Sequence, residues 1–499
     1  MSVSSVRVQC GDKICAVCAK DGETLLSALR SAGFSIPAAC GGRGKCGKCR
    51  VTVNGAPRLA CKVIPNDGDT VIVPKSAGGT ILTETVSIPG LAAGESGCAA
   101  AVDLGTTTVA VRIYDLSSGA ELSTLSAWSA QAAYGADVIS RIQYTIDVPR
   151  GLSELSRCIR EQTKSLIFEA LDAAFRKPEE LQRIVVAGNT VMQHIFAGLQ
   201  VRSIAVAPFV PESLFDECMD DELLGAKIFY SPCVAGYVGG DITAGLLASG
   251  LCEKQGDFLF LDIGTNGEMA LGDKNGFFCC AVASGPAFEG AGISCGMAAL
   301  DGAVSHVRYD RGFLYDVIGG GPARGICGSG LIDLAAALIH LGCIDESGRL
   351  LPPEEVPENV RRFVTPDGNG NGVFHLTSDV YLTAGDVRAL QLAKAAVAAG
   401  IEVLLKHRGI GISELGGIYI AGGFGNYINP ASAMRIGMFP NMPPDRLHSL
   451  GNTSLAGAAM AALNSKKCAE LDRTAKMCNY IELSGDADFT RAFTENMAF

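Results

Sequence analysis

Two similar segments, about 160 residues apart, constrain the fold of this chain most strongly. The first reads AVDLGTTTVAV around Asp103, and the second reads FLDIGTNGEMAL around Asp262. Each begins in an apolar strand-like run and leads into another. In a tight hairpin of this kind, backbone N–H groups and Thr hydroxyls can hold phosphate oxygens while the Asp holds Mg²⁺ or its waters. One such hairpin is a weak signal because Asp-Gly turns are common, but two predict a phosphate site built from two halves.

A third segment, GGIYIAGGFGNYINP, places a Gly-Gly pair after a buried strand. Glycines there would let a base and ribose lie against the backbone, although a plain strand-to-helix turn is the alternative. Together the three segments predict an ATP and Mg²⁺ site. The residues expected to form it are Asp103, Gly105, Thr106, Thr107, Asp262, Gly264, Thr265, Asn266, Gly422 and Gly423.

Near the N-terminus, AACGGRGKCGKCRVTVNGAPRLAC has the cysteine spacing C-x5-C-x2-C-x11-C. A [2Fe–2S] cluster needs four thiolates, and a Gly-rich loop can wrap it so that N–H groups point at the sulfurs. The spacing has one residue more than the plant-type C-x4-C-x2-C in its first gap. Zinc is the alternative metal, but the glycines favour iron–sulfur. The predicted ligands are Cys40, Cys46, Cys49 and Cys61.

A second cysteine group, Cys10, Cys15 and Cys18, has the spacing C-x4-C-x2-C but lacks the glycines and a nearby fourth cysteine. It falls on a predicted hairpin, where alternation would point Cys15 and Cys18 to opposite faces of one strand. We interpret these as ordinary strand cysteines.

The order of elements predicts an α/β multidomain chain. Residues 1–76 read as a hairpin, a short helix at 24–33, the cysteine loop and two further strands, which is the β-grasp pattern of ferredoxin-like domains. Residues 77–98 are small and Gly-rich, as expected of a linker. From residue 99 onward, apolar strands alternate with helical stretches, which indicates α/β architecture.

Charge and composition exclude several classes of function. The net charge of −11 argues against a general nucleic-acid binder. Residues 1–76 are basic, with 11 Lys and Arg against 5 Asp and Glu. The basic residues around the cysteine loop either form a solvated surface or receive an acidic electron donor such as a ferredoxin or flavodoxin; these residues are Arg43, Lys45, Lys48 and Arg50.

The sequence also predicts a cytoplasmic protein. No apolar run is long enough to span a membrane, and the start MSVSSVRVQCGDK lacks the pattern of a signal peptide. Most of the nineteen cysteines are isolated in apolar segments, which is typical of reduced core thiols.

The ordered set of two phosphate loops and a Gly-Gly motif resembles the ATPase superfamily of actin, sugar kinases and heat-shock chaperones, which has a ribonuclease H-like fold in two lobes. The resemblance implies a first lobe at 99–250 and a second at 251–499. It implies connecting helices at 240–250 (GDITAGLLASG) and 451–463 (GNTSLAGAAMAAL). It places Asp241 at the head of the first helix to orient the attacking water, although a capping role is the alternative.

From front to back, the chain is similar to the reductive activators of corrinoid-dependent methyltransferases and corrinoid iron–sulfur proteins, as in AGNTVMQHIFAGL, ASGPAFEGAGI and RGICGSGLIDL. This resemblance implies ATP-dependent reduction of Co(II) to Co(I) on a partner corrinoid protein, and it is compatible with a homodimer. Some members carry two C-terminal [4Fe–4S] clusters, but this C-terminus has only Cys468 and Cys478, which implies a single [2Fe–2S] centre.

Further expectations concern AGNTVMQH, where Asn189 and His194 could line the cleft, with a core position favoured for His194.

The competing functions are an activator of another low-potential enzyme such as a dehydratase, a nucleotide-binding redox sensor, and a sugar kinase fused to a ferredoxin. The front-end cysteine loop argues against the first, and the missing sugar-binding pattern argues against the last.

Overall fold

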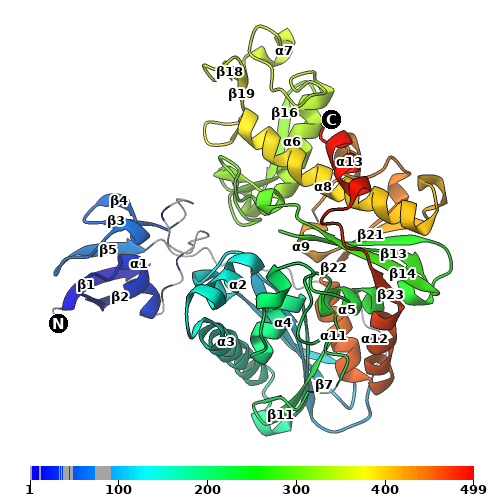
Figure 1. Ribbon diagram of the computed structural model, residues 1–499. Helices are drawn as coiled ribbons and strands as arrows, with labels where there is room; N and C mark the ends of the chain where they lie inside the picture. The colour runs from blue at the N-terminus through cyan, green and yellow to red at the C-terminus, as the bar shows by residue number, and fades with distance from the viewer. Residues whose placement is uncertain are drawn as a thin grey trace.

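The computed structural model of the chain describes residues 3–10, 13–32, 34, 36, 44, 49–73, 92–217, 219–425 and 427–499 (Figure 1). Cys40 and Cys46, together with Arg43, Lys45 and Lys48, lie outside the described residues.

The N-terminal unit is a five-stranded sheet with one helix packed on it. Its elements are β1 (Val3–Cys10), β2 (Lys13–Lys20), α1 (Leu25–Ser31), β3 (Arg50–Val53), β4 (Ala56–Leu59) and β5 (Thr70–Val73). The strand order is β2-β1-β5-β3-β4, with β1 antiparallel to β2 and parallel to β5. Val6 and Val8 of β1 alternate inward and meet Leu25 and Leu29 of α1 in the core. The predicted β-grasp order is confirmed, with β4 as an additional strand.

The rest of the described chain is built around two six-stranded sheets, with two smaller three-stranded sheets beside them. The first contains β6 (Cys98–Leu104), β7 (Thr108–Asp115), β8 (Glu121–Trp128), β9 (Leu181–Gly188), β10 (Glu222–Leu223) and β11 (Ala226–Tyr230). The second contains β12 (Phe258–Ile263), β13 (Gly267–Asp273), β14 (Gly276–Val282), β21 (Gly417–Ala421), β22 (Leu447–Gly451) and β23 (Cys478–Tyr480).

The two six-stranded sheets share one topology over β11-β9-β6-β7-β8 in the first and β22-β21-β12-β13-β14 in the second, and β10 and β23 are additional edge strands. Their orders are β10-β11-β9-β6-β7-β8 and β22-β21-β12-β13-β14-β23. In each, the first strand forms an antiparallel meander with the next two and lies parallel to a strand that comes much later, β9 in one sheet and β21 in the other. Both predicted phosphate segments therefore occupy the same place, the turn between the first two strands of a sheet. This duplicated arrangement is the two-lobed actin-like fold.

Helices cover both faces of the first sheet. They are α2 (Val138–Asp147), α3 (Gly151–Ala173), α4 (Thr190–Ala197), α5 (Gly240–Ser249), α11 (Thr453–Leu463) and α12 (Ser465–Met477). Along β6, Ala100 and Val102 point to the α3 and α4 face, whereas Ala99 and Ala101 point to α5 and α11. Because β6 is buried on both faces, its sequence CAAAVDL is apolar throughout rather than alternating.

Helices α5 and α11 pack against each other at the junction of the lobes (Figure 1). A Cβ atom on Gly457 of α11 would lie 2.1 Å from the carbonyl oxygen of Ala244, so only glycine permits this approach. The other face of α5 places Ile242 and Leu246 against Phe260 of the second sheet. The predicted pair of connecting helices is therefore present, with α5 between the two sheets.

The second sheet is covered by a large α/β region. Its remaining elements are β15 (Ala303–Tyr309), β16 (Phe313–Val317), β17 (Gly325–Ile326), α6 (Gly328–His340), α7 (Glu358–Arg361), β18 (Val364–Pro366), β19 (Gly372–His375), β20 (Tyr381–Leu382), α8 (Ala384–Arg408), α9 (Gly422–Gly425), α10 (Pro430–Arg435) and α13 (Ala487–Glu495). Val397, Ile401 and Leu404 of α8 pack in the same core as Met269 and Leu271 of β13. No helix in the described ranges combines the length and apolar character needed to cross a bilayer.

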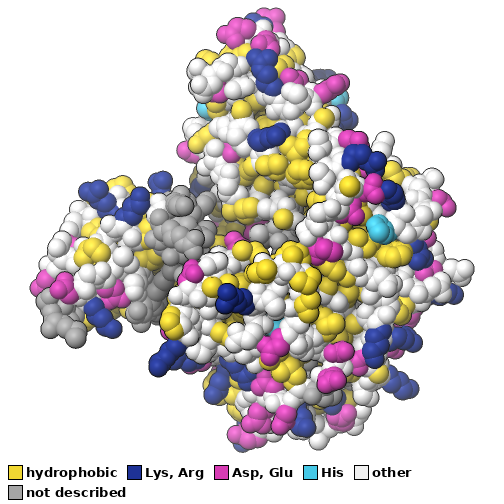
Figure 2. Space-filling model, viewed as in Figure 1, with side chains coloured by type: hydrophobic (Ala, Val, Ile, Leu, Met, Phe, Trp, Pro, Cys, Tyr) yellow, Lys and Arg dark blue, Asp and Glu magenta, His cyan; other side chains and the backbone are white. Residues whose placement is uncertain are grey.

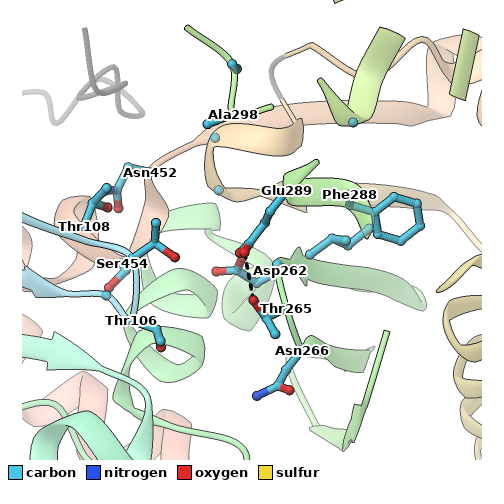
Figure 3. A pocket seen from close by; sticks show the side chains of 18 of the residues that line it. Thr106, Thr108, Asp262, Thr265, Asn266, Phe288, Glu289, Ala298, Asn452 and Ser454 are labelled. Atoms are coloured by element: carbon cyan, nitrogen blue, oxygen red, sulfur yellow. Dashed lines mark hydrogen bonds between the residues drawn. The ribbon is translucent and has the colours of Figure 1, made fainter. Parts of the chain in front are cut away.

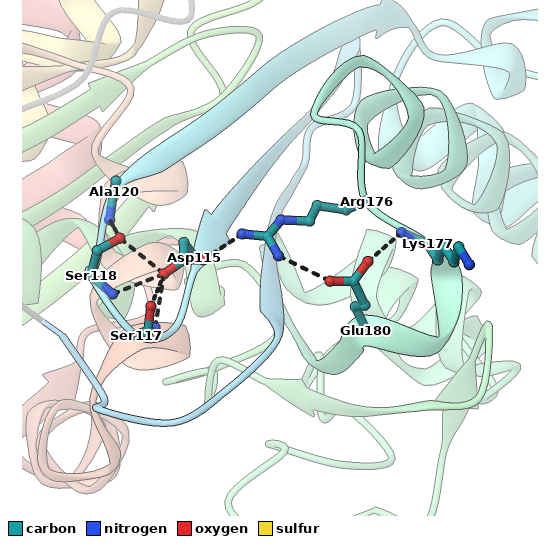
Figure 4. Close-up of polar contacts among 7 residues, drawn as sticks. All are labelled: Asp115, Ser117, Ser118, Ala120, Arg176, Lys177 and Glu180. Carbon is teal, nitrogen blue, oxygen red and sulfur yellow. Dashed lines mark hydrogen bonds and ion pairs between the residues drawn. The ribbon is translucent and has the colours of Figure 1, made fainter.

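A polar cluster joins the end of β7 to the segment after α3 (Figure 4). Arg176 donates to Asp115 Oδ2 at 2.7 Å and to Glu180 Oε2 at 3.0 Å. The other oxygen of Asp115 accepts hydrogen bonds from Ser117 and Ser118 in the turn before β8. These contacts hold the end of the first sheet that lies opposite the phosphate turn.

Candidate functional site

A cavity of about 470 Å³ lies between the two lobes. Hydrophobic side chains gather around the hollow between the lobes (Figure 2). Every residue predicted to contact nucleotide or Mg²⁺ lines this one cavity: Asp103, Gly105, Thr106, Thr107, Asp241, Asp262, Gly264, Thr265, Asn266, Gly422 and Gly423. The structure thus brings together three segments that are far apart in the sequence.

Asp103 lies near the end of β6 and points toward the head of α11. Its carboxylate accepts hydrogen bonds from Asn452 Nδ2 at 2.7 Å and from Ser454 Oγ at 2.8 Å. Asn452 is also the N-cap of α11, since its Oδ1 accepts from the N–H of Leu455 at 2.9 Å. The first phosphate turn is therefore joined directly to the second connecting helix.

The second phosphate turn carries a group of acidic side chains (Figure 3). Asp262 on β12 is directly opposite Glu268 on β13, so both side chains lie on the cleft face of the sheet. Thr265 Oγ1 donates to Glu289 Oε2 at 2.9 Å, which brings the short turn Pro286–Glu289 against the loop. Gly422 has φ +79°, and a Cβ atom there would lie 2.9 Å from Asp262 Oδ1, so the start of α9 requires glycine.

Asp241 lies in the first turn of α5 and faces the same cavity. Gly239, not Asp241, is the N-cap residue, and an Asp241 oxygen accepts from the adjacent N–H of Ile242 at 2.9 Å. Asp241 therefore does not occupy the N-cap position, although it accepts a hydrogen bond from the first turn of α5, and its role at the cleft stays a prediction.

Burial and mutual repulsion raise the pKa values of these carboxyl groups. Burial, with the charges of Asp262 and Asp103, raises the pKa of Asp241 to about 8. Burial and Asp103 raise the pKa of Asp262 to about 6, and burial with neighbouring carboxylates holds the pKa of Glu268 well above its usual value. A site of this kind favours a bound cation.

The donor set fits Mg²⁺ only if a ligand completes it. Among the described residues, no three Asp, Glu, His or Cys side chains converge closely enough to hold a metal by themselves. Mg²⁺ is commonly bound by one or two carboxylates together with substrate phosphates and waters. Asp103 and Asp262 on facing turns, with phosphate oxygens between them, meet that requirement.

Asn189 and His194 have separate environments. Asn189 lines the cavity and its Nδ2 donates to Thr106 Oγ1 at 3.0 Å. His194 is fully buried in α4, with Nδ1 2.7 Å from the Thr190 carbonyl and Nε2 accepting from the N–H of Ser213. The core position favoured for His194 is confirmed.

Sequence reasoning missed several lining residues. Glu268 lies two residues after Asn266, at the start of the strand that follows the second turn. Pairing this strand with the one before it places Glu268 opposite Asp262, on the same face of the sheet. Asn452 and Ser454 resemble an ordinary helix start, so nothing local indicates their bond to Asp103. Other lining residues that were not anticipated are Trp128, Asp137, Phe288, Glu289, Met297, Ser329 and Tyr427.

The described part of the cysteine site consists of Cys49 and Cys61. Both thiols are buried, and their sulfurs are 3.2 Å apart, too far for a disulfide and close enough to share one metal. Cys49 precedes β3 and Cys61 lies in the turn after β4, so the pairing of β3 with β4 brings them together. Two thiols converging at a loop with other cysteines nearby in sequence suit an iron–sulfur cluster.

The second cysteine group lies on strands, as expected. Cys10 ends β1, while Cys15 and Cys18 are exposed on β2 and pair with Val8 and Ser5 of β1. Three residues of separation on one strand put Cys15 and Cys18 on opposite faces.

Comparison with known proteins agrees with this architecture. Residues 8–66 match the 2Fe-2S iron-sulfur cluster binding domain, 98–254 match the RACo middle region, and 257–499 match the C-terminal domain of RACo, the ASKHA domain. The chain is 34% identical over 420 residues to the corrinoid activation enzyme RamQ of Eubacterium limosum, covering 80% of this chain and 70% of that protein. The chain belongs to this family of corrinoid activators.

Two further relatives support the assignment. A solved structure of a reductive activator for a corrinoid, iron–sulfur protein superposes with a TM-score of 0.71 at 30% identity and covers 99% of this chain and 98% of that one. The [Co(II) methylated amine-specific corrinoid protein] reductase of Methanosarcina barkeri is 25% identical over 417 residues, covering 75% of this chain and 72% of that protein. The ferredoxin-like front and the actin-like ATPase predicted from the sequence are confirmed.

Proposed function

We propose that this chain reduces the inactive Co(II) form of a corrinoid protein to Co(I) at the expense of ATP. One observation carries the proposal: a β-grasp unit with the close Cys49 and Cys61 thiols precedes a two-lobed, acid-lined cleft in one chain. The relatives named as corrinoid activators and as a Co(II) reductase support the same reaction.

Cys40, Cys46, Cys49 and Cys61 are proposed to hold a [2Fe–2S] cluster, which supplies one electron when it is reduced. Plant-type clusters have reduction potentials of about −400 mV. The reduction potential of the Co(II)/Co(I) couple is expected to be lower. Each 59 mV of shortfall costs a factor of about ten in a one-electron equilibrium. An energy source is therefore needed, and the nucleotide cleft provides one.

The cleft residues are proposed to convert nucleotide binding into lobe movement. Asp103 and Asp262 hold Mg²⁺ from the two facing turns, while Thr106, Thr107, Thr265 and Asn266 contact phosphates. Asp241 orients the attacking water. Because Asp103 is bonded to Ser454 of α11, a nucleotide that displaces or charges Asp103 acts directly on the helix pair at the lobe junction.

The decisive experiment mixes the anaerobically reduced protein with a candidate corrinoid protein and follows the Co(I) absorption with and without ATP. We expect Co(I) to accumulate only with ATP and Mg²⁺. Equal reduction with ATP omitted would contradict the proposal. ATP turnover stimulated by the corrinoid protein would separate this activity from that of a nucleotide-binding redox sensor.

An acidic ferredoxin or flavodoxin is proposed as the electron donor, received by Arg43, Lys45, Lys48 and Arg50. Opposite charges attract less as salt screens them. Cluster reduction by such a donor should slow as ionic strength rises, and kinetics that are flat from low to high salt would remove this part of the proposal.

We also propose that the chain divides into domains at 1–76, 77–98, 99–250 and 251–499. The separately buried cores of the N-terminal unit and the two sheets support this division.

The protein is further proposed to work in the cytoplasm and to be able to form a homodimer. Size-exclusion chromatography with light scattering tests the oligomeric state.

A further inference from the structure

The cleft lining has an unusual charge balance for a site that would receive a polyphosphate. Six carboxyl groups line it, and no Lys, Arg or His does so among the described residues. The six are Asp103, Asp137, Asp241, Asp262, Glu268 and Glu289. A nucleotide that carries several negative charges would be repelled unless positive charge enters from elsewhere.

One cation lies directly behind the first phosphate turn. Arg141 of α2 has no exposed surface, and all the groups that accept its hydrogen bonds are neutral. Nε donates to the Gly135 carbonyl at 3.1 Å, and Nη1 contacts Gln131 Oε1 at 3.1 Å and Met192 Sδ at 2.8 Å. Nη2 donates to the Thr106 carbonyl at 2.5 Å.

This guanidinium makes no ion pair with any described residue. Asp137, the nearest acid in sequence, instead caps α2 by accepting from the N–H of Ser140 at 2.7 Å. Burial lowers the pKa of Arg141 to about 10, so the side chain remains charged at neutral pH. Asp137 attracts this charge and opposes the effect of burial on its pKa, but forms no ion pair with it. A buried charge that makes no ion pair is costly, and the phosphates of a nucleotide at the adjacent turn would provide negative charge beside it.

The contact with Thr106 also sets the direction of one peptide group. In a trans peptide, the carbonyl of one residue and the N–H of the next point to opposite sides. Since the Thr106 carbonyl is bonded to Arg141, the Thr107 N–H points away from Arg141, and it has no hydrogen-bond partner in the part of the chain that the structure describes. Asn189 holds the Thr106 hydroxyl as well, so this peptide is fixed from two sides.

We infer that Arg141 is a positioning residue for nucleotide phosphates: it fixes the Thr106–Thr107 peptide so that the Thr107 N–H serves as a phosphate donor, and its charge offsets the acidic lining. The inference rests on the nucleotide-binding part of the proposed function. It assigns the positioning of a phosphate donor, the Thr107 N–H, to a residue that does not itself line the cavity.

Calorimetric titration with Mg²⁺ and ADP, with Mg²⁺ and the non-hydrolysable analogue AMP-PNP, and with adenosine tests this assignment. Arg141→Met should lower the affinity for the two nucleotides about 10- to 100-fold, the range expected for losing a hydrogen bond to a charged group. The affinity for adenosine should not change. Arg141→Lys keeps the charge but loses the fork, so its affinities should fall between those of wild type and Arg141→Met. Arg150→Met removes an exposed arginine nine residues away and should bind all three ligands normally.

The outcomes are distinct. Equal losses for nucleotides and adenosine would show a general structural role and overturn the inference, as would unchanged affinity for the nucleotides. If wild-type protein binds neither nucleotide, the proposed function fails as well. If wild-type protein binds both nucleotides and the Arg141 variants bind them equally well, the proposed function stands without a role for Arg141.

Hydrogen exchange on the wild-type chain gives a second test that needs no variant. Mg²⁺ and AMP-PNP should slow exchange of the Thr107 amide, whereas adenosine should not. Absence of protection at Thr107 in the nucleotide complex would contradict the inference even if the Arg141 variants do not fold.

Discussion

The Ser454 hydroxyl donates a 2.8 Å hydrogen bond to Asp103, a residue 351 positions earlier in the chain. The bond joins the first phosphate turn, on β6, to the first turn of α11. Any change in the charge or position of Asp103 is thereby transmitted to a helix that contacts α5 and the first sheet.

Ser454→Ala should uncouple that connection. Loss of one hydrogen bond to a carboxylate is expected to lower corrinoid-stimulated ATP turnover about tenfold, with little change in the unfolding temperature. Steady-state phosphate release measures the effect. Ser153→Ala removes a hydroxyl that bonds only the Arg150 carbonyl, and it should behave as wild type; equal turnover in both variants would show that the bond to Asp103 carries no coupling.

Cys49→Ser and Cys61→Ser should each abolish the cluster. Their sulfurs are 3.2 Å apart and both residues are buried. Neither a water molecule nor an exposed thiol can therefore easily take the place of either one as a cluster ligand. Iron and acid-labile sulfide, measured after anaerobic preparation, should fall to background. Cys15→Ser and Cys18→Ser change exposed strand cysteines and should retain full iron content; loss of iron in these controls would mean that β2 contributes ligands.

Gly457→Ala should separate α5 from α11. The added methyl carbon would lie 2.1 Å from the Ala244 carbonyl oxygen, so the helices must move apart. We expect the free energy of unfolding to fall by about 1–3 kcal/mol. We also expect the rate of ATP-dependent corrinoid reduction to fall, because the two helices lie at the junction of the lobes. Gly312→Ala has open space around the new methyl group and an ordinary backbone angle, so denaturant unfolding of that variant should match wild type.

Asp115 should give the first lobe an acid-sensitive contribution to stability. Hydrogen bonds from the Ser117 hydroxyl, and then from the Ser118 N–H and hydroxyl, lower the pKa of Asp115 from 3.8 to about 2. Because the folded state binds the proton less well than the unfolded state, this stabilisation is complete above about pH 4 and is lost as the pH falls toward 2.

Asp115→Asn should therefore be less stable than wild type by about 1 kcal/mol at pH 7, with the difference shrinking below pH 4. Urea unfolding of both proteins between pH 2 and pH 7 measures this. A difference that stays constant across the whole range would indicate that the carboxylate charge has no part in the contact shown in Figure 4.

Removal of divalent cations should abolish nucleotide binding. Six carboxyl groups line the cleft, and negative charge is already so crowded there that burial, with the charges of Asp262 and Asp103, raises the pKa of Asp241 to about 8. Without Mg²⁺, phosphates would meet negative charge on both lobes. Titration of AMP-PNP in EDTA should show affinity at least about 100-fold weaker than with Mg²⁺, whereas adenosine should bind equally in both conditions.

Much of this architecture could be predicted from local sequence, because the decisive signals are short. Asp103 and Asp262 each follow an apolar strand and precede a Gly-Thr turn, and both turns line one cavity. The thiol spacing likewise identified Cys49 and Cys61. The roles given to these residues remain predictions, but their placement agrees with what the pattern indicated.

The residues that were missed depend on long-range packing. Ser454 is placed by a helix that crosses the lobe junction, and nothing near it in sequence indicates a bond to Asp103. Arg141 belongs to an amphipathic helix, α2, in which a charged residue would ordinarily face water. Its contact with the Thr106 carbonyl exists only because α2 packs beside the first phosphate turn.

The placement of α11 has a consequence for biosynthesis. Ala99 and Ala101 of β6 are covered by α11, which is synthesised about 350 residues later. At translation rates of roughly 5–20 residues per second, β6 waits about 20–70 s for the part of this cover that α11 supplies, although α5 is made earlier. Its small alanine side chains leave only a thin apolar surface for a chaperone or a neighbouring nascent chain to capture during that interval.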